Sequence, residues 1–402
     1  MQARYRCRID PAPGQRAMLA RTSGCVRVVF NDAVRCRDEA YRAGEKVSST
    51  EVQRRVITLA KAGEDRAWLG EVASVALVQS VRDADRAFRN WFDSMAKRRK
   101  GRPAGRPRFK SRKDNRQSAR FTRSGFTLRP GGRLYLAKIG DVRVRWSRGL
   151  PSEPSSVTVI REPDGHYYAS FVVEVTPTPL PPVDREAGLD LGIARLATLA
   201  ASDGQRVDIP NPRHLARKHR TLARLEREKA RRAKGGKNRD KTRRKVAIQH
   251  GRVARARRDY HHKLALTLVR ENQAVHVEDL NITGMVRNRR LARAISDAGW
   301  AQFVRLIEEK AERHGRTVHK VSRWLPSSKT CSACGYVMDG MPLRVRVWSC
   351  PGCGAAHDRD HNAAKNILAA GQAERLNARG ARVSPSARVA MGDEAGTTPD
   401  AA

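Results

Sequence analysis

Four cysteines in the C-terminal third of the chain have the spacing of a metal site. Cys331 and Cys334 form one Cys-x-x-Cys pair, and Cys350 and Cys353 form another after fifteen intervening residues. A glycine directly follows each pair, as in zinc knuckles. Four thiolates complete a tetrahedral zinc site without an open position, so we predict structural zinc. His357 could replace one thiolate, and a redox dithiol is the alternative that two pairs in series disfavour.

Three acidic residues could provide carboxylates for a second, different metal site. Asp190 lies in an apolar stretch bordered by two glycines, where an unpaired carboxylate is costly to bury, and Glu278 ends another apolar stretch. Asp360 is expected at the N-cap of a helix over 363–368, where free amides favour negative charge. Brought together, these acids could hold two Mg²⁺ ions on a phosphodiester. The spacing alone leaves open that each is a helix cap or an ion-pair partner.

The composition indicates a polyanionic partner. The 402 residues include 81 Lys and Arg against 41 Asp and Glu, a formal net charge of +40. Such an excess repels itself unless phosphates neutralise it, which points to nucleic acid. A basic membrane-surface protein is disfavoured because the sequence has no apolar run of about 20 residues. No signal peptide is recognised at the N-terminus, and paired cysteines within an odd total of seven favour metal in a reducing cytoplasm.

The pattern of apolar residues predicts an α+β, multidomain chain. Residues 119–175 form short β-prone runs separated by Pro-Gly-Gly and Pro-Asp-Gly turns, which indicate a small antiparallel barrel. Residues 3–9 can supply its first strand. Helical periodicity from 15 to 97 then makes a helical bundle an insertion into that barrel.

Two segments concentrate positive charge. Residues 97–113 are rich in Arg, Lys, Gly and Pro, so they form a loop rather than a helix. Residues 213–260 hold twenty Lys and Arg against four acids and predict two long basic helices with a break at Gly235-Gly236. A solvated linker and a solvated helix face are the alternatives, but the one-sided charge favours contact with nucleic acid.

Several motifs together resemble one protein family. They are Gly188-Leu-Asp190-Leu-Gly192, Glu278-Asp-Leu-Asn281, Ser296-Asp-Ala-Gly-Trp300, Pro326-Ser-Ser-Lys-Thr-Cys331 and Asp358-Arg-Asp360-His-Asn-Ala-Ala-Lys-Asn-Ile367. They are similar to the motifs of the OrfB/TnpB insertion-sequence proteins, RNA-guided endonucleases related to type V CRISPR effectors. The resemblance extends over nearly the whole chain up to Ala370.

The resemblance implies roles for individual residues. Asp190, Glu278 and Asp360 match the three metal-binding acids of the family's RuvC nuclease site. The four cysteines match its zinc ligands. Asp358 is expected to orient Asp360 or nearby backbone rather than to act itself, and His361 occupies a variable position.

The resemblance also implies domain boundaries. A wedge β-barrel takes its first strand from residues 1–10 and the rest from 101–183, with a helical recognition bundle at 11–100 inserted between them. Residues 184–370 form an RNase H-like RuvC domain with a zinc ribbon inserted at 325–356. The small, polar residues of 371–402 are expected to be a disordered tail.

As a function, the resemblance implies a metal-dependent endodeoxyribonuclease encoded by a transposable element. A guide RNA from the element's end would direct it to double-stranded DNA beside a short transposon-adjacent motif. The alternatives are a guided or unguided DNA-binding regulator that has lost cleavage and an accessory transposition protein. A transposase that itself joins strands is disfavoured, because the sequence shows no tyrosine or serine recombinase constellation. We expect a monomer in a prokaryotic cytoplasm, associated with the nucleoid when bound to DNA, although the sequence does not fix the oligomeric state.

Overall fold

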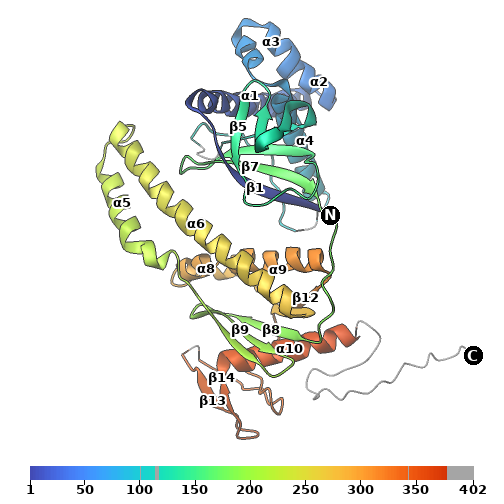
Figure 1. The fold of residues 1–402 in the computed structure, drawn as a ribbon, viewed down its shortest axis with the longest axis vertical. Coiled ribbons are helices and arrows are strands. Elements are labelled where there is room, and N and C mark those ends of the chain that lie inside the picture. Colours follow the sequence, from blue (N-terminus) through green and yellow to red (C-terminus); the bar gives the residue numbers. More distant parts are fainter. Residues whose placement is uncertain (100, 114–116, 343, 378–402) are drawn as a thin grey trace, which may run out of the picture. The chain divides into compact units, whose positions relative to one another are not determined.

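The computed structural model describes residues 1–99, 101–113, 117–342 and 344–377. The chain divides into two compact units, Met1–Val175 and Thr176–Ala402, each with its own hydrophobic core (Figure 1). The candidate metal ligands predicted from the sequence all lie in the second unit.

The first unit is built on one antiparallel sheet of seven strands in the order β2-β6-β7-β1-β5-β4-β3. The strands are β1 (Gln2–Asp10), β2 (Gln117–Thr122), β3 (Phe126–Arg129), β4 (Arg133–Leu136), β5 (Gly140–Arg145), β6 (Ser156–Arg161) and β7 (Tyr167–Glu174). β1 lies between β5 and β7, which confirms that the N-terminal strand joins strands more than a hundred residues away. Among the described residues β2 and β3 are not paired with each other, so the sheet is a curled half-barrel and not the closed barrel predicted.

The helices of this unit lie between β1 and β2 in the chain, as the predicted insertion requires. They are α1 (Pro13–Arg42), α2 (Ser49–Gln53), the π-helical η1 (Arg54–Leu59), α3 (Ala60–Ala62), the 3₁₀ segment η2 (Glu64–Glu71) and α4 (Ser74–Met95). Fully buried side chains from α1, α4 and the sheet share one core, for example Val29, Leu77 and Phe171. The helical segment therefore folds as one body with the sheet.

The basic segment 97–113 has no regular secondary structure in its described part, as predicted. It is nevertheless held in place on the helices. The Asn31 side chain donates to the Lys110 carbonyl (3.1 Å) and accepts from the Lys110 amide (2.7 Å), and the Ala104 amide donates to the Ser94 hydroxyl (2.8 Å). These contacts order a loop that composition alone would leave as a linker.

The second unit contains a five-stranded sheet in the order β10-β9-β8-β11-β12. The strands are β8 (Glu186–Leu191), β9 (Arg195–Ala201), β10 (Arg206–Pro210), β11 (Ala274–Glu278) and β12 (Thr317–Val321). β8, β9 and β10 are antiparallel neighbours, whereas β8, β11 and β12 run parallel. The carboxyl ends of β8, β11 and β12 therefore meet at one edge of the sheet.

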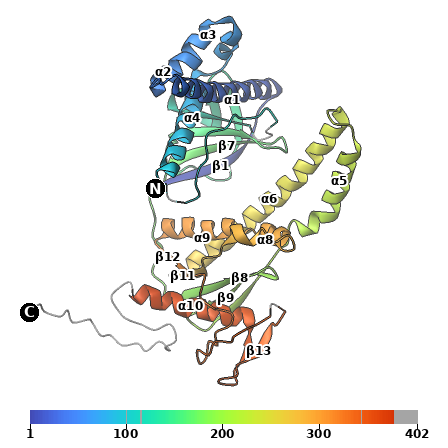
Figure 2. The same cartoon turned by 180° about the vertical axis from the view of Figure 1, so that it is seen from behind.

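Helices cover both faces of this sheet (Figures 1 and 2). They are η5 (Ala216–Lys218), α5 (His219–Arg231), α6 (Lys237–Glu271), α7 (Ile282–Met285), α8 (Ala292–Ala298), α9 (Trp300–His314) and α10 (Arg359–Asn377). α6 and α9 cover one face and α10 the other, while α5 and the first half of α6 form a hairpin that extends away from the sheet. Among the described helices, none combines the length and the apolar character needed to span a bilayer.

α10 crosses the sheet at very close range because glycines occupy both sides of the contact, one on the sheet and one in the helix. A Cβ at Gly188 on β8 would lie 2.2 Å from the Ala364 carbonyl oxygen, and a Cβ at Gly371 on α10 would lie 2.0 Å from the His276 ring. The helix continues to Asn377, so residues 371–377 are helical and the predicted tail does not begin at 371. Residues 378–402 of that predicted tail lie outside the described residues.

Substitution of Gly188 tests this close packing. Gly188→Ala should lower the free energy of unfolding of the second unit by about 1–3 kcal/mol or more, because backbone atoms of α10 would have to move. Gly340→Ala is the matched control, since a Cβ there meets nothing within 4 Å. Thermal unfolding of both variants measures the difference. Equal midpoints would show that α10 has room to move on β8.

Candidate active site and cysteine cluster

Two of the three predicted acids lie side by side at the edge where the parallel strands end. Val277 of β11 is the register partner of Leu189 of β8, and each is followed directly by an acid, Glu278 and Asp190. Both acids are half-buried. Both acids lie on apolar strands, but the apolar stretch around Asp190 folds into two antiparallel strands, β8 and β9. Parallel pairing of β8 with β11 brings the two acids together across 87 intervening residues.

The third acid comes from α10, but not from its cap. Asp360 is the second residue of the helix, and Asp358 is the residue that caps it: the Asp358 carboxylate accepts from the His361 amide at 2.9 Å. The prediction of Asp360 as the N-cap of a helix over 363–368 is therefore wrong, because the helix begins four residues earlier. The expectation that Asp358 orients backbone near Asp360 is confirmed.

The three carboxylates influence one another electrostatically. Burial, together with the negative charges of Asp360 and Glu278, raises the pKa of Asp190 to about 7. Burial also raises the pKa of Glu278. In the part of the chain that the structure describes, the four cysteines form a compact group of potential metal ligands, and the three acids do not.

Arginines that the sequence analysis did not identify surround Asp360. Arg195 on β9 lies 3.4 Å from Asp360, and Arg346 lies 3.2 Å from its other oxygen. Arg195 and Arg206 also contact Asp358, at 3.7 and 3.2 Å. No local signal marks these arginines among the many of a strongly basic chain, since Arg195 is 165 residues from its partner.

The four cysteines come together as predicted. Their sulfur atoms all lie within 4.8 Å of one another, and they are the one compact group of potential metal ligands in the part of the chain that the structure describes. Cys331 and Cys353 are 3.7 Å apart at sulfur, and Cys334 and Cys350 are 3.6 Å apart. Zn–S bonds of about 2.3 Å would place tetrahedral sulfurs about 3.8 Å apart. The donor set and its spacing thus fit zinc.

The knuckle turns have the glycines that they need. Gly335 and Gly354 follow the two pairs with φ of 79° and 72°, a left-handed conformation that favours glycine. His357 lies beside the cluster, with Nε2 3.0 Å from the Cys331 sulfur. Since four sulfurs already form the compact group, His357 is an adjacent hydrogen-bonding partner.

Two asparagines join the cysteine cluster to α10. Asn362 accepts from the Ser332 amide at 2.9 Å and donates to the Thr330 carbonyl at 2.7 Å. Asn366, one turn later, donates to the carbonyls of Ser327 and Thr330, both at 2.7 Å. The i, i+4 spacing of these asparagines was visible in the sequence, but their partners were not. They fix the first knuckle to the helix that carries Asp360.

Positive charge gathers on the hairpin of α5 and α6, as predicted for residues 213–260. A small apolar cluster of Leu222, Leu225 and Val246 packs between the two helices, and the Thr242 hydroxyl of α6 donates to Glu228 of α5 at 3.1 Å. A cavity of about 530 Å³ between them is lined by Thr221, Arg224, Leu225, Glu228, Arg231, Lys245 and Gln249. Such a basic helical surface is suited to phosphate contact.

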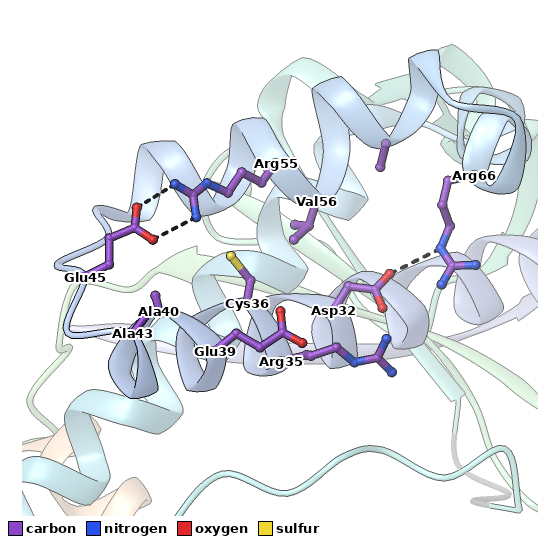
Figure 3. Close-up of a pocket in the computed structure, with 11 residues that line it drawn as sticks. Asp32, Arg35, Cys36, Glu39, Ala40, Ala43, Glu45, Arg55, Val56 and Arg66 are labelled. Atoms are coloured by element: carbon purple, nitrogen blue, oxygen red, sulfur yellow. Dashed lines mark hydrogen bonds and ion pairs between the residues drawn. The ribbon is translucent and has the colours of Figure 1, made fainter.

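A cavity of about 500 Å³ in the first unit is a weaker candidate site (Figure 3). It lies between α1 and the segment from α2 to η2. Its carboxylates are largely paired: Glu45 with Arg55 at 2.6 Å, and Asp32 with Arg66 at 3.4 Å (Figure 3). Acids neutralised in this way do not attract a cation, so the cavity offers no comparable metal site.

Comparisons with known proteins agree with the motifs. Residues 170–289 match the OrfB/IS605 model described as "Probable transposase", and residues 300–367 match "Cas12f1-like, TNB domain". Residues 1–46 match a "Helix-turn-helix domain"; in this structure they form β1 and the long helix α1.

Similar proteins match over most of their length. A protein of Streptomyces pristinaespiralis named "Putative RNA-guided DNA endonuclease" is 45% identical, covering 92% of this chain and 89% of that protein. "Putative RNA-guided DNA endonuclease InsQ" of Escherichia coli (strain K12) is 31% identical, with 92% of each covered. The solved Cas12f1-sgRNA-target DNA complex has the same fold at 16% identity, with a TM-score of 0.55 over 88% of this chain and 83% of that chain. By this identity over nearly its full length, the chain belongs to the OrfB/TnpB family of insertion-sequence proteins.

Proposed function

We propose that this protein is an RNA-guided DNA endonuclease encoded by a transposable element. It cuts double-stranded target DNA beside a short adjacent motif, with Asp190, Glu278 and Asp360 as the metal-binding acids. The observation that carries this proposal is the meeting of these acids from β8, β11 and α10 at one sheet edge. The strand order of the second unit, three antiparallel strands followed by two parallel ones, supports an RNase H-like RuvC domain.

Hard oxygen donors suit Mg²⁺. Burial and the neighbouring carboxylates raise the pKa of Asp190, and a bound cation would favour its ionised form. When bound there, two Mg²⁺ ions would supply Lewis-acid stabilisation of the phosphodiester and a water of lowered pKa. Asp190 and Glu278 orient their carboxylates from rigid strand ends. Arg195 and Arg346 balance the charge of Asp360.

We propose zinc for the cysteine cluster, in a structural role. Four sulfur ligands leave no position for substrate, so the cluster supports the fold instead of reacting. Through Asn362 and Asn366 it holds the start of α10. The zinc ribbon of 325–356 is thereby tied to the nuclease domain that it interrupts.

The guide RNA and DNA would occupy the basic surfaces. The α5–α6 hairpin and the segment 97–113 both carry many more Lys and Arg than Asp and Glu. Base pairing with the guide would supply sequence specificity, and the protein would contact phosphates and the short motif. The protein would act as a monomer in the prokaryotic cytoplasm. A regulator that has lost cleavage is the less favoured function, because all three acids are present.

Substitution of each acid tests the cleavage proposal. Asp190→Ala, Glu278→Ala and Asp360→Ala should each reduce Mg²⁺-dependent cleavage of target DNA by about three orders of magnitude or more, while RNA binding persists. Single-turnover cleavage by the RNA-loaded protein is the measurement. Asp203→Ala, at an exposed turn between β9 and β10, is the matched control. Any acid variant that cuts at the wild-type rate removes that acid from the site.

The same purified complex tests the guided part of the proposal. RNA that copurifies with the wild-type protein should be a discrete structured species with a variable 3′ end. Random RNA fragments, or a wild-type complex that binds its target without cutting it, would contradict a guided nuclease and favour the regulator.

Asp190 should also make the metal-free protein sensitive to pH. Its pKa is about 7 in the folded protein and 3.8 as an ordinary carboxyl, so stability is lost as pH rises from about 4 to 7. Asp190→Asn removes this penalty and should stabilise the metal-free protein at pH 8 by roughly 2–4 kcal/mol, at about 1.4 kcal/mol per pKa unit. At pH 3.5 the gain should vanish. Mg²⁺ should reduce the difference in stability between Asp190→Asn and the wild type at pH 8, because it stabilises only the wild type.

Thermal unfolding at both pH values, with and without Mg²⁺, measures the effect. Asp203→Asn is the control, and its effect on stability at pH 8 should have the opposite sign. A hydrogen bond from the Gln205 amide lowers the pKa of Asp203, so the ionised carboxylate stabilises the folded protein. An unchanged midpoint for Asp190→Asn at pH 8 would mean that Asp190 carries no such penalty.

Removal of one sulfur tests the cluster. Cys331→Ser should release zinc and loosen the attachment of the knuckle to α10, because three thiolates hold the ion less tightly. Metal analysis of the purified protein measures zinc per chain, and proteolysis reports local loosening. Cys36→Ser, in the first unit, should retain all its zinc. Unchanged zinc content in Cys331→Ser would exclude this cysteine as a ligand.

A further inference from the structure

A tryptophan next to the acid site is almost fully exposed. Trp324 follows β12 and is 85% exposed, more than any other large apolar side chain in the described residues. Tryptophan side chains are usually well buried because their apolar area is large. An indole ring with this exposure and a defined position is suited to stacking against a planar ligand.

The register of the sheet places Trp324 close to the acids. Val321, the last residue of β12, is the register partner of Glu278, and the Asp279 amide donates to the Val321 carbonyl at 3.1 Å. Arg323 then forms an ion pair with Asp279, the neighbour of Glu278. Trp324 therefore stands three residues beyond the strand position beside Glu278, at the same edge of the sheet.

The backbone around Trp324 is fixed although its side chain is free. The Trp324 amide donates to the Ser322 hydroxyl at 3.3 Å, and the Leu325 amide donates to the Ser322 carbonyl at 3.1 Å. Leu325 packs against Val321 and Ile367, beneath α10. This anchoring presents the indole without the entropic cost of ordering a mobile loop.

We propose that Trp324 is a stacking platform for an unpaired base of the DNA strand that enters the carboxylate site. This inference rests on the proposed nuclease function and adds a contact to it. Aromatic rings bind unpaired bases by stacking whatever their sequence, which suits a nuclease whose specificity comes from base pairing. The neighbouring guanidinium of Arg323 can contact the backbone phosphate of the same nucleotide.

Fluorescence of a stacked base tests the contact independently of cleavage. A target DNA opened by a bubble carries 2-aminopurine at successive positions near the cut site and is bound to the RNA-loaded protein in EDTA. At one or two positions the wild type should quench the probe, Trp324→Phe should retain most of the quenching, and Trp324→Ala should lose it. Tyr41→Ala is the matched control, because Tyr41 is 82% exposed in the first unit.

Cleavage with Mg²⁺ gives the second measurement. Trp324→Ala should cut about tenfold more slowly or worse, with RNA and zinc content unchanged. An abasic nucleotide at the quenched position should slow the wild type by a similar factor and the variant no further. Quenching that is the same in Trp324→Ala, or loss of RNA from that variant, overturns the inference. Trp324-dependent quenching in a wild type that never cuts supports the inference and contradicts the nuclease function.

Discussion

The close contact between α10 and the sheet is the constraint on which the candidate site depends. Asp190 and Glu278 are fixed by strand pairing, but Asp360 reaches them only if the helix lies directly on the backbone of β8. Gly188 permits that approach from the sheet side, and Gly371 permits it from the helix side. A side chain at either position would lift α10 by more than the tolerance of a metal site, since ligands must be placed within about 0.5 Å.

The second requirement is electrostatic. Three half-buried acids lie at one edge, and burial together with repulsion from Asp360 and Glu278 raises the pKa of Asp190. Arg195 and Arg346 offset part of this repulsion by contacting Asp360 from opposite elements. The site therefore combines a set of carboxylates that a cation would stabilise with two guanidinium groups that form ion pairs with one of them. This balance would suit a phosphate, which needs positive charge beyond the metal ligands.

The sequence predicts those parts of the fold and of the candidate site that are marked by residues close together in the chain. An acid within an apolar run identified Asp190, an acid at the end of another identified Glu278, and paired cysteines identified the cluster, because these patterns lie within a few residues. The helix start was misplaced because Asp358 and Asp360 are equally good capping residues by type, and only the backbone decides between them. A barrel was predicted, but the structure has an open, curled sheet. The alternation of apolar and polar residues identifies single strands and does not report whether the first and last strands of the sheet pair with each other. Arg195 and Arg206 were not identified because their partners are distant in sequence.

The cysteine cluster and the acids are separate in chemistry but not in structure. β14 (Ala356–Asp358) pairs with β13 (Val347–Ser349) inside the cysteine module and runs without a break into α10. Arg346 stands one residue before β13, so the module itself supplies a cation to Asp360. Asn362 and Asn366 then bind the first knuckle to the same helix. An inserted module without a role in the candidate site would need none of these contacts. Here the pairing of β13 with β14 determines where α10, the helix that carries Asp360, begins.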